Sequence, residues 1–478
     1  MSTIAAIATA PGGAIGIIRV SGTEAINIVN SVFSKDILDA KGYSLHYGEI
    51  TNTSPLGEIE RGPHIIDDVL ISVFRSPHSY TGEDSIEISC HGSRYILETI
   101  LSLLIEKGCL LAQPGEFTQR AFLNGKMDLT QAEAVADLIA SSNASQHRIA
   151  INQMRGGITS RLHELRDKLL HLTSLLELEL DFSDHEELEF ADRSELEDVA
   201  LSIKQEITKL LESFSAGNAI KNGIPVAIIG APNVGKSTLL NALLGDDRAI
   251  VSDIQGTTRD LIEDTITIEG RLFRFIDTAG IRHTDDTIEN LGIERSLKAA
   301  KKARIIILMR DDEHDYPELP QPSAISHQPS DPQPSALSPQ PSHLSPVNYQ
   351  LSTINCQLST PSALSPQPPV IIKIHNKSDN FQALNGIGID ELKQKLVYSA
   401  PSNDDAVVVN QRHKEALTMA LADIQRAIAA LKQGLSGDLV SEDLRLCIQH
   451  LADILGGEGT ITTPEVLANI FKHFCVGK

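Results

Sequence analysis

The sequence predicts a multidomain α/β protein in which a mainly parallel, doubly wound sheet is inserted into an all-helical domain, preceded by an α+β domain. Between about 219 and 396, four apolar runs with strand character alternate with loops and helical segments, which indicates a parallel sheet covered by helices. Helical periodicity dominates 119–218 and 397–478 on either side of it. Short alternating runs punctuated by Gly and Pro fill 1–118, as is typical of an α+β domain. A chain of 478 residues has the length of about three domains.

The composition is that of an ordinary globular protein and argues against several classes. Hydrophobic residues make up 41% and charged residues 22% of the chain, and no run reaches the ~20 apolar residues of a membrane span. The start of the chain lacks the basic region of a signal peptide, so we expect a cytoplasmic protein. The five cysteines form no CxxC pair, which argues against a zinc site. The net charge of −22 argues against broad, non-specific nucleic-acid binding.

Two local patterns in the first 140 residues carry structural predictions. In the run SIEISC, Ile86 and Ile88 fall on one face of a strand and Glu87 on the other, because successive side chains of a strand alternate. Further along, Thr130 and Glu133 have the spacing of a capping box at the start of a helix.

A low-complexity insertion occupies about 317–369, between two predicted strands of the sheet. It holds more than half of the 22 prolines of the chain and contains PSALSPQP twice. Such a composition buries too little apolar surface to offset its ordering entropy. We therefore expect a disordered excursion from the sheet.

The clearest chemical motif is GAPNVGKS, Gly230–Ser237, which follows the apolar run PVAIIG and precedes the helical run TLLNALLG. A loop of this pattern between a strand and a helix binds phosphate, because its glycines let backbone N–H groups surround the anion and the helix N-terminus adds a favourable dipole. We expect Lys236 to contact the β- and γ-phosphates and the Ser237 hydroxyl to ligate Mg²⁺.

Two further motifs follow in order, each directly after a predicted strand. DTAG, Asp277–Gly280, places a carboxylate at the metal and a backbone N–H near the γ-phosphate, and Thr258 in GTTRD is a second candidate Mg²⁺ ligand. NKSD, Asn376–Asp379, ends in a carboxylate that can accept two hydrogen bonds from guanine, each of roughly 1.5–3 kcal/mol, and adenine lacks this donor pair. Each motif alone is also an ordinary turn. All three in order at strand ends predict a GTP site.

One position departs from many small GTPases, which place a Gln after DxxG to orient the attacking water. Here Ile281 follows Gly280. Hydrolysis must then be assisted by a carboxylate from the stretch HTDDTIENLGIERS, by a cation that replaces an arginine finger, or by a second subunit.

Long blocks of the chain resemble the MnmE (TrmE) family of tRNA-modification GTPases. They are IGIIRVSG, SYTGEDSIEISCHG, PGEFTQRAFLNGKMDLTQAEAVADLI, GAPNVGKSTLLNAL, RAIVSDIQGTTRD, DTAGIRHTDD with IENLGIERS, and the closing FCVGK. The resemblance implies an N-terminal tetrahydrofolate-binding and dimerisation domain over 1–118. It also implies a helical domain in two segments, 119–218 and 397–478, with a P-loop G domain over 219–396.

The resemblance also implies an activity and partners. The family acts as a homodimer that forms a heterotetramer with MnmG, a subunit that uses FAD and NADH. Together they add an aminomethyl-type group to C5 of the wobble uridine of certain tRNAs. A tetrahydrofolate derivative, in its 5-formyl or methylene form, supplies the one-carbon unit, and glycine or ammonium supplies the nitrogen. GTP hydrolysis in this family uses Mg²⁺ and K⁺.

The family's site residues map onto this sequence as follows. The GTP contacts would be Asn233, Val234, Gly235, Lys236, Ser237, Thr238, Ser252, Asp253, Ile254, Gln255, Gly256, Thr257, Thr258, Asp277, Thr278, Ala279, Gly280, Asn376, Lys377 and Asp379. The K⁺ ligands would be Asn233, Ser252, Ile254 and Thr257, and the Mg²⁺ ligands Ser237 and Thr258. Glu289 would arrange the attacking water beside Lys236, and folate would contact Arg19, Glu87, Lys126 and Lys478.

The chain end TPEVLANIFKHFCVGK reads as a helix with an apolar stripe. For Cys475 on that stripe there are two hypotheses. One is a small buried hydrophobe, and the other is a catalytic thiol brought to the folate site together with Lys478. The helix would in both cases deliver the terminus to a pocket built by the other end of the chain.

The sequence departs from the family in two places. APGGAIG, before Arg19, is one residue shorter than the usual Gly-rich turn, and Gln382 stands where the loop behind the guanine base normally has Ser. Two other functions are alternatives. A ribosome-assembly switch usually adds an RNA-binding module with a GXXG loop after the G domain, whereas this chain adds amphipathic helices that end in FCVGK. A stand-alone folate-dependent one-carbon transferase leaves the GTPase motifs unexplained.

Overall fold

The computed structural model describes residues 2–52, 64–181, 193–231, 233–245, 264–276, 299–317, 369–378, 381–401, 408–456, 467, 471, 474 and 477. The chain forms two compact units. The first comprises Met1–Gly223, Glu269–Leu272 and Pro401–Lys478, and the second comprises Ile224–Ile268 and Phe273–Ala400. The low-complexity insertion predicted over 317–369 lies almost entirely outside the described residues.

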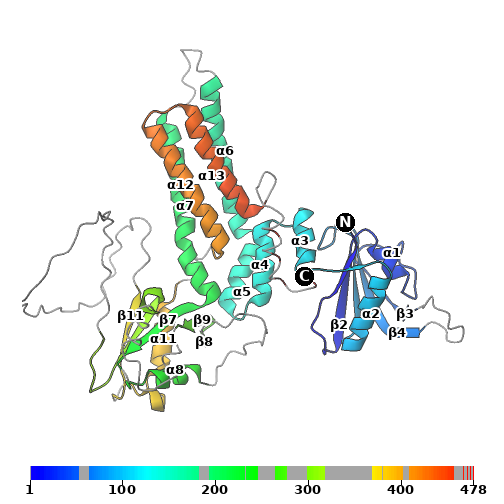
Figure 1. Cartoon of the computed structure of the whole chain (residues 1–478), viewed down its shortest axis with the longest axis horizontal. Coiled ribbons are helices and arrows are strands. Elements are labelled where there is room, and N and C mark those ends of the chain that lie inside the picture. The colour runs from blue at the N-terminus through cyan, green and yellow to red at the C-terminus, as the bar shows by residue number, and fades with distance from the viewer. Residues whose placement is uncertain are drawn as a thin grey trace, which may run out of the picture. The chain divides into compact units, whose positions relative to one another are not determined.

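The N-terminal lobe of the first unit, the blue part of Figure 1, contains a six-stranded sheet. Its strand order is β3-β4-β5-β2-β1-β6. All of its neighbouring strands pair antiparallel except β1 and β6, which are parallel. The strands are β1 (Ile4–Ile7), β2 (Ile15–Ser21), β3 (Ser44–Asn52), β4 (His64–Phe74), β5 (Ser85–His91) and β6 (Leu110–Leu111), and the helices are α1 (Ala25–Asn30) and α2 (Arg94–Glu106).

Alternation along the strands decides which face of this sheet is buried. Ile86 and Ile88 of β5 and Ile18 of β2 belong to one fully buried core with the apolar sides of α1 and α2. The intervening residue Glu87 lies on the opposite face, where a smaller cluster includes Phe117. The predicted separation of Glu87 from its apolar neighbours is therefore confirmed.

The helical lobe of the first unit is dominated by four long helices that pack side by side (Figure 1). They are α6 (Gly157–Asp181), α7 (Arg193–Asn222), α12 (Gln411–Lys432) and α13 (Gly437–Leu455), and three shorter helices precede them, α3 (Glu116–Leu123), α4 (Leu129–Ala140) and α5 (Ala144–Met154). Their shared core draws apolar residues from all four long helices. Segments before and after the second unit thus form one hydrophobic core.

The predicted capping box at Thr130 and Glu133 is wrong. Helix α4 begins two residues earlier than predicted, with Asp128 as its N-cap and Gln131 completing the box. The Asp128 carboxylate accepts a 2.8 Å hydrogen bond from the Gln131 N–H, and the Gln131 side chain accepts one of 3.0 Å from the Asp128 N–H. The sequence DLTQAE contains both spacings, and Glu133 is used elsewhere.

Glu133 is the centre of a buried polar network that joins α4 to α12. Its carboxylate accepts hydrogen bonds from Arg412 Nε at 2.8 Å and Asn410 Nδ2 at 2.6 Å, and it lies 2.8 Å from His413 Nε2. Arg412 also donates to the carbonyl oxygens of Asp453 and Ile454 at the end of α13. Burial alone would raise the pKa of Glu133, but the hydrogen bonds and charges of His413 and Arg412 outweigh it and lower that pKa to about 2.

The second unit is built on a five-stranded sheet in the order β11-β10-β7-β9-β8. Pairs β10–β11, β10–β7 and β7–β9 are parallel. The strands are β7 (Ile224–Gly230), β8 (Asp264–Ile268), β9 (Arg271–Phe275), β10 (Ile305–Arg310) and β11 (Val370–His375), with helices α8 (Lys236–Leu244), η1 (Ala383–Asn385) and α11 (Ile389–Ser399). Because β7 comes first in the chain and lies in the middle, the strand order reverses there, and ligands of such sheets bind at that point.

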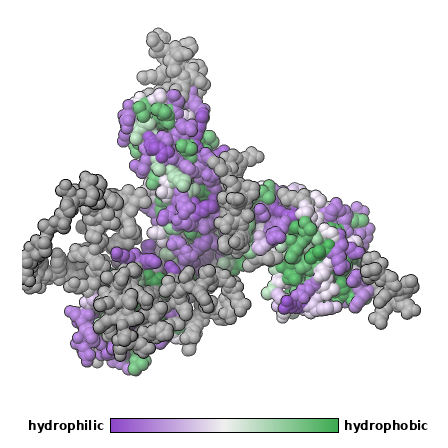
Figure 2. All heavy atoms as spheres, viewed as in Figure 1, coloured by the Kyte–Doolittle hydropathy of each residue, from purple (hydrophilic) through white to green (hydrophobic). Residues whose placement is uncertain are grey.

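Among the described residues no helix combines the length and the apolar character of a membrane span. In the view of Figure 2 the helical lobe is covered mainly by hydrophilic residues, whereas hydrophobic residues gather on the N-terminal lobe.

Candidate functional site

The loop between β7 and α8 has a backbone that can approach an anion closely. Gly235 is the N-cap of α8 and has a φ of 93°, a left-handed value that favours glycine. A Cβ atom at Gly235 would lie 2.3 Å from Asn376 Nδ2, and one at Gly230 would lie 2.8 Å from the Met309 carbonyl oxygen. Neither position therefore has room for a side chain. The first N–H groups of a helix have no acceptor within the helix, and together with the helix dipole they make such a start a favourable place for an anion.

Lys236 is the first residue of α8, and its side chain folds back over this loop. Its ammonium donates hydrogen bonds to the carbonyl oxygens of Gly230 at 2.9 Å and Ala231 at 2.7 Å. Burial lowers the pKa of Lys236. An ammonium that has lost hydration and has two neutral acceptors gains strongly from an anionic ligand.

Asn376, the first residue of NKSD, connects this motif to the β7–α8 loop. Its Nδ2 donates to the Val234 carbonyl oxygen at 2.8 Å, and its Oδ1 accepts from the Ala383 N–H at 3.1 Å. Asn376 is only 5% exposed. The shortened segment that carries Gln382 therefore still holds Asn376 in place, through the N–H group of Ala383.

Some of the remaining predicted site residues lie in the described part of the structure and the others lie outside it. Ser237 and Thr238 lie in the first turn of α8, Asn233 lies exposed in the loop with a φ of 63°, and Lys377 pairs with Asp311 at 2.8 Å. Among the described residues no group of three or more His, Cys, Asp and Glu is arranged to hold a metal ion. The predicted residues outside the described part are Ser252, Asp253, Ile254, Gln255, Gly256, Thr257, Thr258, Asp277, Thr278, Ala279, Gly280, Glu289, Asp379, Cys475 and Lys478.

A second group of predicted residues meets on the N-terminal sheet. Arg19 of β2 and Glu87 of β5 are directly opposite each other in the antiparallel register. Both Arg19 Nη2, at 2.8 Å, and Arg19 Nε, at 3.0 Å, donate to Glu87 Oε1. The pair is partly exposed, with 21% and 27% of the two side chains accessible. Among the residues that the structure describes, Glu87 Oε2 has no hydrogen-bond donor, so this oxygen can accept from a ligand.

Aromatic rings and the C-terminal segment surround this pair. The Arg19 guanidinium carbon lies 5.6 Å from the ring centroids of both Tyr80 and Phe117, within the range of a cation–π contact. Arg19 Nη1 also donates to the Gly477 carbonyl oxygen at 3.3 Å. Gly477 packs so closely on β1 that a Cβ atom there would lie 2.5 Å from the Ile7 carbonyl oxygen.

Two more residues show how the segment before Gly477 is held. Phe471 and Phe474 are buried in a cluster with Leu129 and Ala132 of α4. The predicted anchoring of this segment is therefore confirmed for Phe471 and Phe474, while both hypotheses for Cys475 stay open.

Lys126, the remaining predicted folate contact, is placed differently. Its ammonium donates to the Pro77 carbonyl oxygen at 2.9 Å, and its stem lies beside Gly82. The side chain of Lys126 thus packs against the β4–β5 loop, which carries Tyr80.

Sequence reasoning missed three residues that the structure brings into these sites, Tyr80, Phe117 and Asp311. Nothing in the spacing around Tyr80 predicts that its ring reaches Arg19, because that contact depends on the loop between β4 and β5. Asp311 did carry a signal. It directly follows β10, at the strand end where ligands of such sheets bind.

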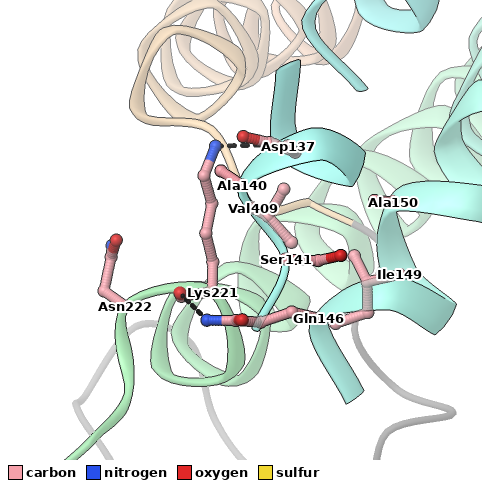
Figure 3. A pocket seen from close by; sticks show the side chains of 9 residues that line it. All are labelled: Asp137, Ala140, Ser141, Gln146, Ile149, Ala150, Lys221, Asn222 and Val409. Carbon is pink, nitrogen blue, oxygen red and sulfur yellow. Dashed lines mark hydrogen bonds and ion pairs between the residues drawn. The ribbon is translucent and has the colours of Figure 1, made fainter. Parts of the chain in front are cut away.

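A separate pocket of about 200 Å³ lies in the helical lobe, where α4, α5 and α7 meet (Figure 3). Lys221 crosses it and donates to Asp137 at 2.7 Å, and the Lys221 carbonyl oxygen accepts from Gln146 Nε2 at 2.8 Å. Ligand pockets usually span roughly 300–1,000 Å³. This one is too small for a nucleotide or folate and contains none of the predicted site residues.

Comparison with known proteins covers both lobes. Residues 129–475 match the family model described as MnmE helical domain, and residues 3–126 match the one described as GTP-binding protein TrmE N-terminus. Over 100% of its length, the chain is similar to three relatives named tRNA modification GTPase MnmE. It is 53% identical to that of Parabacteroides distasonis, 50% to that of Phocaeicola vulgatus and 46% to that of Porphyromonas gingivalis, and covers 100%, 99% and 98% of those proteins.

Proposed function

The chain belongs to the MnmE family of tRNA modification GTPases, and on that premise we propose that it hydrolyses GTP while a carboxymethylaminomethyl-type group is added to C5 of the wobble uridine. It is a GTPase that acts in tRNA modification. The observation that carries the nucleotide part is the hydrogen bond from Asn376 to the Val234 carbonyl oxygen, which joins two of the three GTP motifs at the switch point of the sheet.

In this proposal the phosphates lie on the β7–α8 loop. The N–H groups that follow Gly235 and the ammonium of Lys236 bind the β- and γ-phosphates, and Asp379 reads the guanine base. Ser237 and Thr258 hold Mg²⁺, a cation that prefers such oxygen donors. The K⁺ ligands are Asn233, Ser252, Ile254 and Thr257. This K⁺ supplies positive charge at the γ-phosphate while Glu289 orients the attacking water, which replaces the missing Gln.

The Arg19–Glu87 pair supports a folate site on the N-terminal sheet. A pterin ring presents adjacent N–H donors that a carboxylate such as Glu87 accepts, and the Tyr80 and Phe117 rings offer flat apolar surface beside it. Arg19 and Lys126 are cations for the acidic part of a tetrahydrofolate derivative. Lys478 follows Gly477, whose carbonyl oxygen already contacts Arg19. The derivative supplies the one-carbon unit of the modification.

We further propose a homodimer through the N-terminal lobe. Ile15, Leu45 and Tyr47 are large apolar side chains of the sheet that are exposed by 66%, 64% and 61%. Leu45 is opposite Ser72, which in turn is opposite Glu87, so the exposed apolar side chains share a face with the proposed folate pair. A second copy that covers this face would bury the apolar surface. A heterotetramer with the FAD- and NADH-dependent MnmG subunit, acting on tRNA in the cytoplasm, completes the proposal.

Mass spectrometry of tRNA nucleosides tests the function directly. Cells that lack this gene should accumulate wobble uridines without the C5 group, and the wild-type gene should restore the modification. A gene carrying Lys236→Ala should not restore it. Unchanged wobble uridines in the deletion strain would reject the modification chemistry.

A further inference from the structure

The side chain of Lys377, the second residue of NKSD, is anchored at its charged end and is largely exposed. Its ammonium lies 2.8 Å from Asp311 Oδ2. The carboxylate is almost completely buried, whereas 56% of the Lys377 side chain is exposed. The charged tip is therefore fixed on a buried carboxylate, while much of the side chain remains accessible.

The backbone of Lys377 is also held in place. It has a φ of 64°, which residues other than glycine rarely adopt. On one side Asn376 is tied to Val234 and Ala383, and on the other the Ser378 hydroxyl donates to the His375 carbonyl oxygen at 2.8 Å. The hydrogen bonds of its neighbours thus hold the backbone of Lys377 in this conformation. They also place Lys377 next to Asn376, which contacts the β7–α8 loop of the proposed nucleotide site.

Asp311 is itself tightly fixed. Its Oδ1 accepts from the His314 N–H at 3.0 Å and lies 2.8 Å from His314 Nδ1. The segment after it is held against the sheet, because Tyr316 lies under the cations of Arg310 and Lys373 at 5.1 and 5.2 Å. The hydrogen bonds from Lys377 and His314 keep the pKa of Asp311 well below its usual range, so the carboxylate is charged at neutral pH.

We propose that Asp311 is a positioning residue for guanine nucleotide binding, which holds the Lys377 ammonium so that the methylene stem forms one wall of the purine site. Long cationic side chains commonly lay their stems along flat apolar surface while the charged end is satisfied elsewhere. A stem that is already ordered loses less conformational freedom when the base arrives. The inference rests on the proposed GTP site and adds a residue outside its three motifs.

The test compares Asp311→Asn with Asp312→Asn as a matched control. Asp312 is the next residue, carries the same charge and pairs with His375 at 2.8 Å, but its side chain is 76% exposed. Titration with the fluorescent nucleotide mant-GDP should show an affinity about tenfold weaker for Asp311→Asn, as expected for loss of a hydrogen bond to a charged group. Asp312→Asn should stay within about twofold of wild type.

A double-mutant cycle separates positioning from general loosening of the structure. Lys377→Met keeps a stem of similar length without the ammonium, and as an exposed position it leaves the fold intact. It should weaken mant-GDP binding to a similar extent, and Asp311→Asn should add nothing in that background. Thermal unfolding of each variant checks the fold independently.

Three results would overturn the inference. They are unchanged affinity in Lys377→Met, unchanged affinity in Asp311→Asn, or an Asp311→Asn effect that persists fully in the Lys377→Met background. A wild-type protein that does not bind mant-GDP would instead overturn the nucleotide site itself, and this inference with it.

Discussion

The Asn376 side chain donates a 2.8 Å hydrogen bond to the carbonyl oxygen of Val234, a residue 142 positions earlier in the chain. The contact passes beside Gly235, where a Cβ atom would lie 2.3 Å from the same Asn376 nitrogen. The absence of a side chain at Gly235 is thus what lets two strand-end motifs touch.

Gly235→Ala should therefore weaken nucleotide binding strongly. The added methyl group must displace Asn376, and the left-handed backbone adds a strain of roughly 1–2 kcal/mol. We expect mant-GDP affinity to fall at least tenfold, measured by fluorescence titration. Gly125→Ala is the control, because Gly125 also has a positive φ but open space where its Cβ would lie. Equal affinities of the two variants would show that Asn376 does not depend on Gly235.

Glu87→Gln should weaken folate binding. The amide has an acceptor at only one of its two end atoms, and it lacks the negative charge that pairs with Arg19. Calorimetry with 5-formyltetrahydrofolate should give an affinity about tenfold lower. Glu98→Gln removes a comparable charge from an exposed pair with Arg94, so its affinity should match that of wild type. A Glu87→Gln protein that binds folate normally would remove this residue from the site.

Acid should destabilise the helical lobe through Glu133 and His413. The pKa of Glu133 falls from 4.5 to about 2 on folding, so its stabilisation is complete above pH 4.5 and is lost as the pH falls toward 2. Burial, as the largest cause, lowers the pKa of His413 from its ordinary value of 6.5, so the unfolded chain binds a proton first and stability already declines below that pH.

Denaturant unfolding at several pH values measures this effect. Glu133→Gln should flatten the decline between pH 4.5 and 2 and cost about 3 kcal/mol at neutral pH. Glu177→Gln breaks an exposed pair with Arg445 and should change stability by less than about 1 kcal/mol. An unaltered dependence of stability on pH in Glu133→Gln would contradict the lowered pKa of Glu133 as a cause of the acid destabilisation.

Potassium should stimulate GTP hydrolysis, and Asn233 should be needed for it. Asn233→Gly removes the proposed K⁺ ligand, while glycine adopts the observed φ of 63° without strain. Hydrolysis assays in KCl and NaCl should show a higher wild-type rate in K⁺ and equal rates for the variant. Equal wild-type rates in the two salts would reject the cation site.

Replacing apolar residues on the open sheet face should weaken the homodimer. Leu70 lies opposite Tyr47 and belongs to the same exposed face as Leu45. We expect the double variant Leu45→Ser with Leu70→Ser to sediment as a monomer at concentrations where wild type is dimeric. Leu384→Ser is the control, since Leu384 is 84% exposed but belongs to the second unit. A wild-type monomer, or a dimer unaffected by the double variant, would contradict the proposed interface.

Much of the fold follows from local patterns. β7 spans Ile224–Gly230, the apolar run next to GAPNVGKS, because a strand buried on both faces is continuously hydrophobic. The start of α4 could not be predicted from the local sequence. Both Asp128 and Thr130 have a capping partner three residues on, and the choice between them depends on Arg412 and His413, which need Glu133 in the interior.

In the candidate sites, too, the residues of short local motifs were predictable and the long-range contacts were not. Lys236 and Asn376 were predictable because each occupies a fixed position in a short motif after a strand. The pairing of Lys377 with Asp311 and of Arg19 with Gly477 was not, since these partners are 66 and 458 positions apart and meet only through the tertiary structure.

The Glu133–Arg412 pair also has a consequence for how the chain is made. The two residues are 279 positions apart, and the α/β unit is encoded between them. At ~5–20 residues per second, a ribosome needs tens of seconds to pass from one to the other. During that interval α4 has emerged without its partner, while the intervening unit is complete enough to fold by itself. The helical lobe is thus among the last parts of the molecule to mature during translation.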